Sequence, residues 1–293
     1  MRKHTIVMTG ASRGIGRVAA DILRREPDVH LVEISRGSSG FHADLGSLER
    51  IRSVAAGIRD RLERGVLPPL RAFAGNAGVQ LTNAMTEGPD GFEATFAVNV
   101  LANHLLVRLL QDRFTTPGRI VITTSDTHFG DLRHNLGMVP APAWRAPAVL
   151  ARPGAFPRPH TAAAGRTAYS TSKLATIHLV HEYARRLPSG LDAIAYNPAF
   201  VPGTALARDA GPVSRFAMRR ILPAMTLTPF ATTRRAAGRH LAEVVLGRIA
   251  APTGSYVDRG RVARSSAESY APERERELWE TLEELTAAHR PPR

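Results

Sequence analysis

A tyrosine and a lysine four residues apart form the most distinctive pair of reactive side chains in the sequence, within the segment AYSTSKLA (168–175). The chain has 39 lysines and arginines, and only Lys3 and Lys173 are lysines. Residues four apart share one face of a helix. An ammonium beside the Tyr169 phenol should stabilise the phenolate and bring its pKa closer to neutrality, so that this tyrosine can exchange a proton with a substrate oxygen. Lysine also offers a compact, rotatable charge for ribose hydroxyls, which the planar fork of arginine does not.

A glycine-rich turn, TGASRGIG (9–16), lies between a predicted strand and a predicted helix. Glycines allow the backbone to turn tightly and approach a pyrophosphate, and a helix N-terminus presents free N–H groups to the negative charge. We therefore predict a dinucleotide site here. Its expected contacts are Gly10, Ser12, Arg13, Gly14, Ile15 and Gly16.

The residues that follow the second predicted strand favour NADP(H) over NAD(H). An acidic residue at the tip of that strand would bind a ribose 2′-hydroxyl, whereas arginine accommodates a 2′-phosphate. Arg36 follows the strand, Arg13 lies in the glycine turn, and Glu33 lies inside the strand rather than at its tip. A guanidinium can bind a phosphate through two hydrogen bonds.

Three further strand ends supply candidate site residues. Asp44 should contact the adenine amino group, Asn76 can bridge strands, Gly78 leaves room for the cofactor, and Ser125 ends a strand. The additional predicted cofactor contacts are Asp44, Leu45, Asn76, Ala77 and Gly78.

Short β-branched runs alternate with helical patterns along the first two thirds of the chain. The predicted strands are 4–9, 30–34, 71–75, 119–124 and 191–196, and the predicted helices are 14–25, 46–63, 90–112 and 166–187. This alternation predicts an α/β fold, a single doubly wound Rossmann-type domain over residues 1–293 with a mostly parallel sheet of about seven strands. Ligands bind such sheets at the carboxyl ends of the strands.

Two long segments interrupt the alternation, an insertion at 130–165 and a segment at 199–230. Both should leave the sheet beside the predicted site, so we interpret them as walls and a lid over a roomy apolar substrate pocket; a disordered insertion at 130–165 is the alternative. Their large apolar residues are Trp144, Phe156, Phe200, Phe216, Met218 and Phe230. The tail 272–289 predicts an amphipathic helix that packs on the core or contacts another copy in a homo-oligomer.

Composition narrows the remaining classes. The formal charge is +13, but the arginines are scattered without interleaved aromatic residues, so we expect no nucleic-acid partner. No apolar run is long enough for a membrane span, and the short basic N-terminus is not typical of a signal peptide, so we expect a cytoplasmic protein. The chain has no cysteine, which excludes disulfides and thiolate metal sites. Two histidines three apart, His178 and His181, lack further ligands for a metal.

Together these segments resemble the short-chain dehydrogenase/reductase family. TGASRGIG, NAG, Asn99, Ser125, YSTSK and NPAFVPGT (197–204) occur in the family's order, and the stretches 90–110 and 254–270 look like the branch with retinol dehydrogenases and protochlorophyllide reductases. The resemblance implies a catalytic tetrad. Tyr169 would be the acid/base, Ser125 would bind the carbonyl, Lys173 would hold the ribose, and Asn99 would anchor a proton-relay water.

The sequence departs from the family pattern after the last catalytic strand. The usual Pro-Gly is Pro198-Ala199, and the threonine expected to bind the nicotinamide amide is shifted to Thr204. The resemblance implies cofactor contacts from Pro198, Val201 and Thr204. Neither substrate of the resembling branch is transferred, because the chain lacks the cysteine associated with protochlorophyllide photochemistry and shows no N-terminal anchor like that of many retinol enzymes.

Three functions remain open from the sequence. The first is an NADPH-dependent reductase of a bulky, mainly apolar carbonyl compound, or the reverse alcohol dehydrogenase, in secondary metabolism. The second is a carbon–carbon double-bond reductase on a conjugated ring system. The third is an NADPH-binding sensor without turnover, which has no need of both Tyr169 and Ser125.

Overall fold

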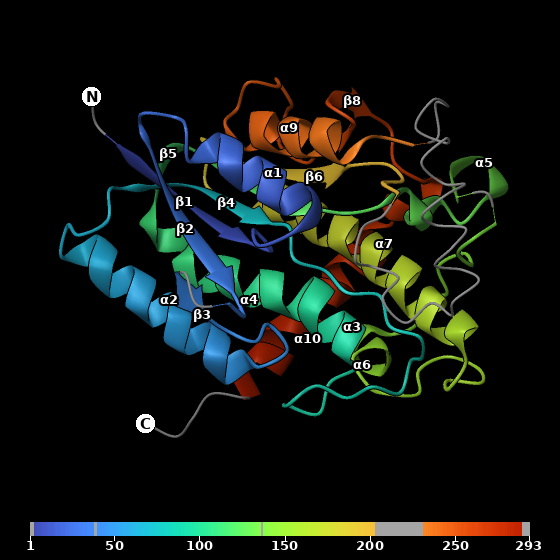
Figure 1. Ribbon diagram of the computed structural model, residues 1–293. Coiled ribbons are helices and arrows are strands. Elements are labelled where there is room, and N and C mark those ends of the chain that lie inside the picture. Colours follow the sequence, from blue (N-terminus) through green and yellow to red (C-terminus); the bar gives the residue numbers. More distant parts are fainter. Residues whose placement is uncertain (1–2, 38–39, 136, 203–230, 289–293) are drawn as a thin grey trace.

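A single eight-stranded sheet lies between two layers of helices in the computed structural model (Figure 1). The structure describes residues 3–37, 40–135, 137–202 and 231–288. The strands are β1 (His4–Thr9), β2 (Val29–Ser35), β3 (Phe41–His42), β4 (Leu70–Gly75), β5 (Phe114–Thr123), β6 (Leu191–Asn197), β7 (Tyr256–Asp258) and β8 (Arg261–Ala263). Their order is β3-β2-β1-β4-β5-β6-β7-β8, and all neighbours are parallel except β7 and β8. The predicted fold class is confirmed, and the short strands β3, β7 and β8 are additions to the five strands read from the sequence.

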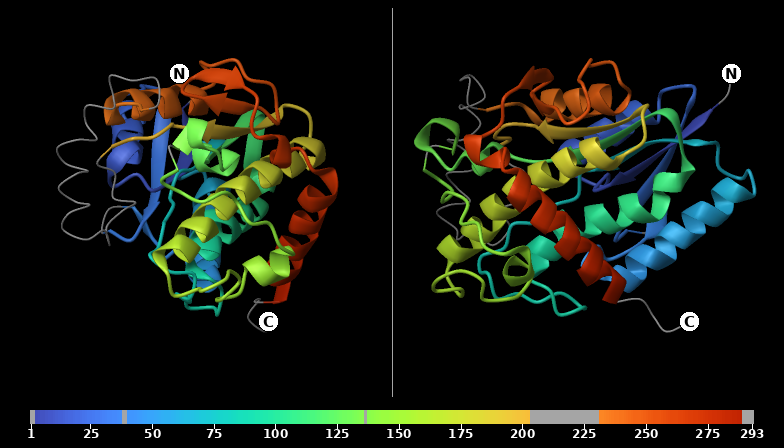
Figure 2. Two further views of the ribbon diagram at one scale, coloured as in Figure 1. Left: turned by 90° about the vertical axis from the view of Figure 1, so that its right-hand side faces the viewer. Right: turned by 180° about the vertical axis from the view of Figure 1, so that it is seen from behind.

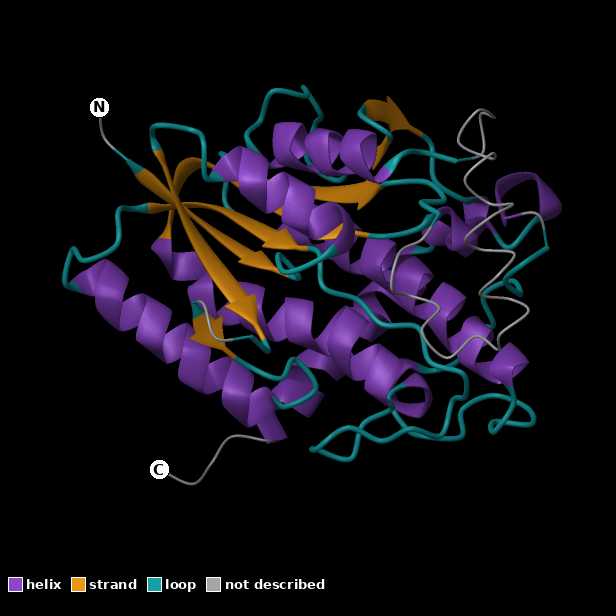
Figure 3. Ribbon diagram, in the orientation of Figure 1, coloured by secondary structure: helices purple, strands orange, loops and turns teal. Residues whose placement is uncertain are grey.

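The helices cover both faces of the sheet, as the alternating strands and helices predict (Figure 3). The longer ones are α1 (Gly14–Leu23), α2 (Leu48–Glu63), α4 (Ala102–Leu110), α7 (Ala162–Arg186), α9 (Arg234–Val245) and α10 (Pro272–Ala288). Short helical turns are α3 (Ala94–Phe96), η1 (Ala97–Leu101), η2 (Gln111–Arg113), η3 (Asp126–Phe129), α5 (Leu132–Asn135), α6 (Pro147–Leu150) and η6 (Ala267–Ser269).

Each face of the sheet has its own hydrophobic core. In β1, Ile6 and Met8 belong to the core under α1 and α9, whereas Val7 belongs to the larger core under α2, α4 and α7. Alternate residues of a strand point to opposite faces, so a strand buried on both faces reads as a continuous apolar run. This explains why TIVM in the sequence predicts a central strand.

The C-terminal helix α10 forms an outer layer of its own, crossing α4 and α7 on the side away from the sheet (Figure 2). Its apolar residues Leu278 and Leu282 are fully buried, and Trp279 is nearly so. The predicted core packing of this tail is therefore confirmed.

The strand order fixes where a ligand can bind. β1 is flanked by β2 on one side and β4 on the other, so the chain reverses its direction of winding at β1. Open α/β sheets bind ligands outside the carboxyl ends of the strands at such a switch point. Register places Thr9 beside Gly75, and Gly75 beside Ile122, so the carboxyl ends of β1, β4 and β5 meet there.

The insertion at 130–165 is folded against the body of the protein, apart from residue 136, which lies outside the described residues. Phe156 is buried in the larger core, and Trp144 packs edge-on against His178 of α7. Backbone hydrogen bonds join Ala151 to Glu93 and Pro159 to Ala84. The interpretation of Trp144 and Phe156 as pocket walls is therefore wrong, as is disorder of this stretch, because their apolar surface is used to cover α7 and the N-terminus of α3.

The predicted lid at 199–230 lies mostly outside the described residues, including Thr204, Phe216, Met218 and Phe230. Phe200 is described and forms a bridge to Ala231. Within the described parts of the chain, no helix is both long enough and apolar enough to cross a membrane.

Candidate active site

The glycine turn joins β1 to α1 and is tied to the neighbouring turn after β4. Gly10 has φ of +69°, which favours glycine, and a Cβ on Gly16 would lie 2.0 Å from the Gly10 carbonyl oxygen. Thr9 Oγ1 accepts hydrogen bonds from the N–H groups of Asn76 and Ala77, each at 3.1 Å. The two turns that the sequence assigns to the cofactor are therefore held together at one edge of the sheet.

Asn76 links three strands, as its position in the sequence predicts. Its Nδ2 donates to the Gly10 carbonyl oxygen at 3.1 Å, and its Oδ1 accepts from Thr123 Oγ1 at 3.3 Å. The side chain of Asn76 therefore connects the ends of β1, β4 and β5 and fixes the floor of the site.

The residues expected to choose between NADP(H) and NAD(H) lie on the surface. Arg13 precedes α1 and Arg36 follows β2, and both are exposed. Glu33 is bound by Arg24, whose Nε donates to Glu33 Oε1 at 3.0 Å, so this carboxylate is already engaged within the strand. Asp44 is exposed with its Oδ1 accepting from the Gly46 N–H at 3.0 Å, and the adjacent Leu45 is buried.

Asn99 lies in η1, a single π-helical turn between α3 and α4. Insertions of this kind occur often at functional sites. Asn99 Nδ2 donates to the Val79 carbonyl oxygen at 3.0 Å and to Ser172 Oγ at 2.9 Å, and Asn99 Oδ1 accepts from the Val79 N–H at 2.9 Å. The Asn99 side chain thus holds α7 against the turn after β4. Its backbone carbonyl accepts from Asn103 Nδ2 at 2.8 Å; an anchored relay water at Asn99 stays a prediction.

Tyr169 and Lys173 are both buried in α7, and the Lys173 ammonium lies 5.6 Å from the centroid of the Tyr169 ring. Lys173 Nζ donates to the Thr123 carbonyl oxygen at 2.9 Å. A Cβ on Gly78 would lie 3.4 Å from Lys173 Nζ and 3.3 Å from Asn99 Oδ1. The structure therefore brings Gly78, Asn99, Tyr169 and Lys173 together.

The pKa of the Tyr169 phenol moves in the opposite direction from the one expected. Burial raises the pKa of Tyr169 well above its ordinary value; the hydrogen bond with Ser125 opposes that shift and the negative charge of Asp126 adds to it. Burial also lowers the pKa of the Lys173 ammonium to about 8. Desolvation thus dominates at both groups. Tyr169 keeps its proton at neutral pH, which suits a proton donor.

Ser125 completes the cluster at the end of β5. It caps η3, where its Oγ accepts from the Thr127 N–H at 3.3 Å, and it hydrogen-bonds with Tyr169. Three of the four predicted catalytic residues therefore lie within one hydrogen-bonded group at the carboxyl edge of the sheet, and Asn99 joins them through Ser172.

Comparison with known proteins agrees with this geometry. No protein-family model matches the chain. The proposed daunorubicin C-13 ketoreductase DnrU from Streptomyces sp. (strain C5) is 34% identical over 68% of this chain, which spans 66% of that relative. Protochlorophyllide reductase B of Oryza sativa subsp. japonica is 27% identical over 97% of this chain and 78% of its own length. The chain belongs to the short-chain dehydrogenase/reductase family. This is a family of NAD(P)-dependent oxidoreductases.

The fold of this short-chain dehydrogenase/reductase matches solved structures over most of its length. The ligand-free aldohexose dehydrogenase of Thermoplasma acidophilum superposes with a TM-score of 0.63 at 18% identity, covering 88% of this chain and 94% of that one. At that identity the likeness concerns the fold alone.

The turn after β6 departs from the family pattern in its backbone. Ala199 has φ of +60°, a conformation that glycine adopts without strain and alanine does not. Pro198 and Val201 are buried beside it. Thr204 lies outside the described residues, so its nicotinamide contact stays a prediction.

Sequence reasoning missed a second polar group beside the tetrad. Asp126 follows Ser125 directly, Asn197 ends β6, and Asp258 ends β7. Asn197 Oδ1 accepts from the Asp126 N–H at 3.1 Å, and Asn197 Nδ2 donates to Asp258 Oδ1 at 3.0 Å. The available signal was their position, because each one closes a strand of the sheet at the same edge as Ser125.

Proposed function

We propose that this protein is an NADPH-dependent ketoreductase that reduces a carbonyl group of a bulky, mainly apolar molecule. The observation that supports the proposal is the convergence of Ser125, Tyr169 and Lys173 beside the glycine turn, with Tyr169 protonated at neutral pH. The likeness to DnrU, whose name gives it a ketone of daunorubicin as substrate, favours a ketone on a large ring system.

The side chains would divide the work as follows. Reduced nicotinamide, when bound, supplies the hydride for the carbonyl carbon. Tyr169 donates its proton to the carbonyl oxygen as the hydride arrives. Ser125 donates a hydrogen bond to the same oxygen, where negative charge develops. Lys173, held by the Thr123 carbonyl, binds the ribose of the cofactor and orients it against Tyr169.

The choice of NADPH over NADH rests on Arg13 and Arg36. Both guanidinium groups are exposed at the edge where the adenosine ribose would lie, and Glu33 is occupied by Arg24. Fluorescence titration of NADPH and NADH should show tighter binding of NADPH and a loss of that preference in Arg36→Ala. Arg25→Ala, at the far end of α1, should keep the wild-type preference. Equal affinities for the two cofactors in the wild type would reject the assignment.

The activity is tested by incubating the purified protein with NADPH and polycyclic aromatic ketones, with matched enones in parallel. We expect NADPH oxidation with ketones and an alcohol as the product. The likeness to protochlorophyllide reductase over nearly the whole chain makes double-bond reduction the second candidate. A saturated ketone formed from the enones would favour that candidate. NADPH binding without oxidation by any of these compounds would favour a sensor.

A further inference from the structure

Asp126 is the nearest carboxyl group to the proposed reaction centre and has no part in the tetrad. Its Oδ1 lies 3.3 Å from Ser125 Oγ, and its backbone is fixed by the hydrogen bond to Asn197 Oδ1. As the first residue of η3, it directly follows the serine that would bind the carbonyl. Its side chain can therefore act on Ser125 with little freedom to move away.

The groups around Asp126 do not neutralise its charge. From β7 come Asp258, which repels it, and Arg259, which is itself engaged by Asp258 at 2.8 Å. From η3 comes His128, whose pKa is lowered to about 4 by burial, so its ring is uncharged at neutral pH. From α7 and β7 come the phenols of Tyr169 and Tyr256, which the charge of Asp126 affects in turn.

A carboxyl in these surroundings binds its proton unusually well. Burial, helped by the repulsion from Asp258, raises the pKa of Asp126 to about 7, and the hydrogen bond from Ser125 opposes the shift. Asp126 is partly accessible at its surface, so it can exchange that proton with the solvent. Near neutral pH the site therefore exists in two protonation states.

The two states orient Ser125 differently. An ionised carboxylate only accepts hydrogen bonds, so the single hydroxyl proton of Ser125 is drawn to Asp126. A ketone oxygen also only accepts, and Ser125 then has no proton to give it. A protonated carboxyl instead donates to Ser125 Oγ, and the serine O–H is free to point at the substrate.

We propose that Asp126 is a positioning residue whose protonated form turns the Ser125 hydroxyl toward the substrate carbonyl. This inference rests on the proposed ketone reduction. The charge of Asp126 acts in the same direction on Tyr169, since the ionised form holds the phenol proton more tightly and makes it a weaker acid. Carbonyl reduction is therefore favoured by the neutral form of Asp126 through two neighbouring groups.

The test is the pH profile of kcat/KM for ketone reduction in the wild type and in Asp126→Asn. In the wild type, kcat/KM should fall about tenfold per pH unit above about 7, down to the ~10²-fold loss typical of one missing hydrogen-bond donor. The asparagine amide donates to Ser125 Oγ at every pH, so Asp126→Asn should give a flat profile near the wild-type low-pH value. Asp131→Asn changes an exposed carboxylate in the same loop and should keep the wild-type profile.

A second measurement separates this inference from the proposed function. The Asp126 carboxyl carbon is followed by NMR in protein with ¹³C-labelled aspartate, assigned by its absence in Asp126→Asn. A midpoint near its ordinary value of about 4 overturns the inference whatever the activity. Ketone reduction with the same pH dependence in Asp126→Asn also overturns it while leaving the proposed function intact. A midpoint near 7 in a protein that reduces no ketone rejects the proposed function instead.

Discussion

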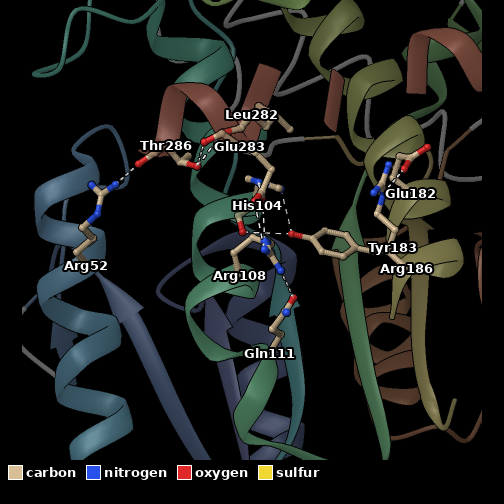
Figure 4. A network of polar contacts seen from close by, with 10 residues as sticks. All are labelled: Arg52, His104, Arg108, Gln111, Glu182, Tyr183, Arg186, Leu282, Glu283 and Thr286. Carbon is tan, nitrogen blue, oxygen red and sulfur yellow. Dashed lines mark hydrogen bonds and ion pairs between the residues drawn. The ribbon is translucent and has the colours of Figure 1, made fainter. Parts of the chain in front are cut away.

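The seam under α10 and the carboxyl edge of the sheet both bury ionisable side chains, but they pair them differently. In the seam, His104 Nε2 donates to Glu283 Oε1 at 2.8 Å, and Arg108 Nε donates to the same oxygen at 2.7 Å (Figure 4). At the edge, Lys173 donates to a neutral carbonyl and Asp126 receives only a serine hydroxyl. Opposite charges meet in the first region, and neutral dipoles serve in the second.

The pKa values record this difference. Hydrogen bonds from His104 and Arg108 lower the pKa of Glu283 to about 2, whereas burial raises the pKa of Asp126 to about 7. A paired carboxylate is fixed in one state and contributes to stability, while an unpaired one near neutrality can exchange its proton. We therefore expect substitutions in the seam to change stability and substitutions at the edge to change activity.

The largest effect should come from Tyr169→Phe at the edge. The change removes one hydroxyl and little volume, so NADPH binding and the melting temperature should stay close to wild type. Turnover should fall by about 10²–10⁴-fold, the range for a lost general acid. The rate of NADPH oxidation with a ketone substrate measures it, and a rate like that of the wild type would reject Tyr169 as the proton donor.

The next effect, on stability, should come from Glu283→Gln in the seam. The amide loses the charge that faces His104 and Arg108, so we expect a loss of about 1.5–3 kcal/mol, the range for hydrogen bonds to charged groups. Urea denaturation measures it. Glu284→Gln changes an exposed neighbour and should cost less than about 0.5 kcal/mol. Similar losses in both variants would show that the seam pairing contributes little.

Stability should also depend on pH through histidines buried without a proton. Burial lowers the pKa of His178 to about 4 from an unfolded value of 6.5. Below 6.5 the unfolded chain binds a proton that the folded one resists, so stability is present above that pH and is lost as the pH falls toward 4. His178→Gln removes one such proton and should reduce the slope by up to about 1.4 kcal/mol per pH unit.

This is checked by urea denaturation between about pH 4 and pH 7. His160 is exposed, so His160→Gln should keep the wild-type slope. The idea fails if His178→Gln and the wild type lose stability in parallel over this range.

What the sequence predicts well is set by local chemistry. The glycine turn, Asn76 and the pair Tyr169–Lys173 are specified by residue types at short spacings, and their positions in the structure agree with the expected site. The protonation of Tyr169 was mispredicted because it depends on burial, which the spacing of two residues does not reveal. Asp126 was missed for a similar reason, since its surroundings come from Asn197 and Asp258 on later strands.

The seam was only half predictable. The apolar stripe of the tail indicated a packed helix, but the polar residues beside it resemble a solvated face. His104 and Glu283 are separated by 179 positions, and no local pattern connects them. Likewise His178 and His181 are neither surface residues nor isolated core residues, because His178 Nε2 contacts the Glu268 carbonyl at 3.1 Å and His181 Nδ1 contacts Glu275 at 2.7 Å.

The smallest predicted effect concerns backbone strain, which also distinguishes the two regions. The described non-glycine residues with positive φ are Arg158, Ala199 and Arg259. Ala199 and Arg259 follow β6 and β7 at the edge of the site, and α10 contains none of them. Ala199→Gly should relieve about 1–2 kcal/mol of left-handed strain and lose about 0.5–1 kcal/mol to the greater freedom of the unfolded chain. The net gain in unfolding free energy should be about 0–1 kcal/mol, with kcat/KM within about threefold of wild type. Ala163→Gly in the exposed start of α7 makes the same change at an ordinary helical φ and should cost about 1 kcal/mol. Equal losses in the two variants would show that Ala199 is held without strain, and the edge would then differ from the seam in its charges alone.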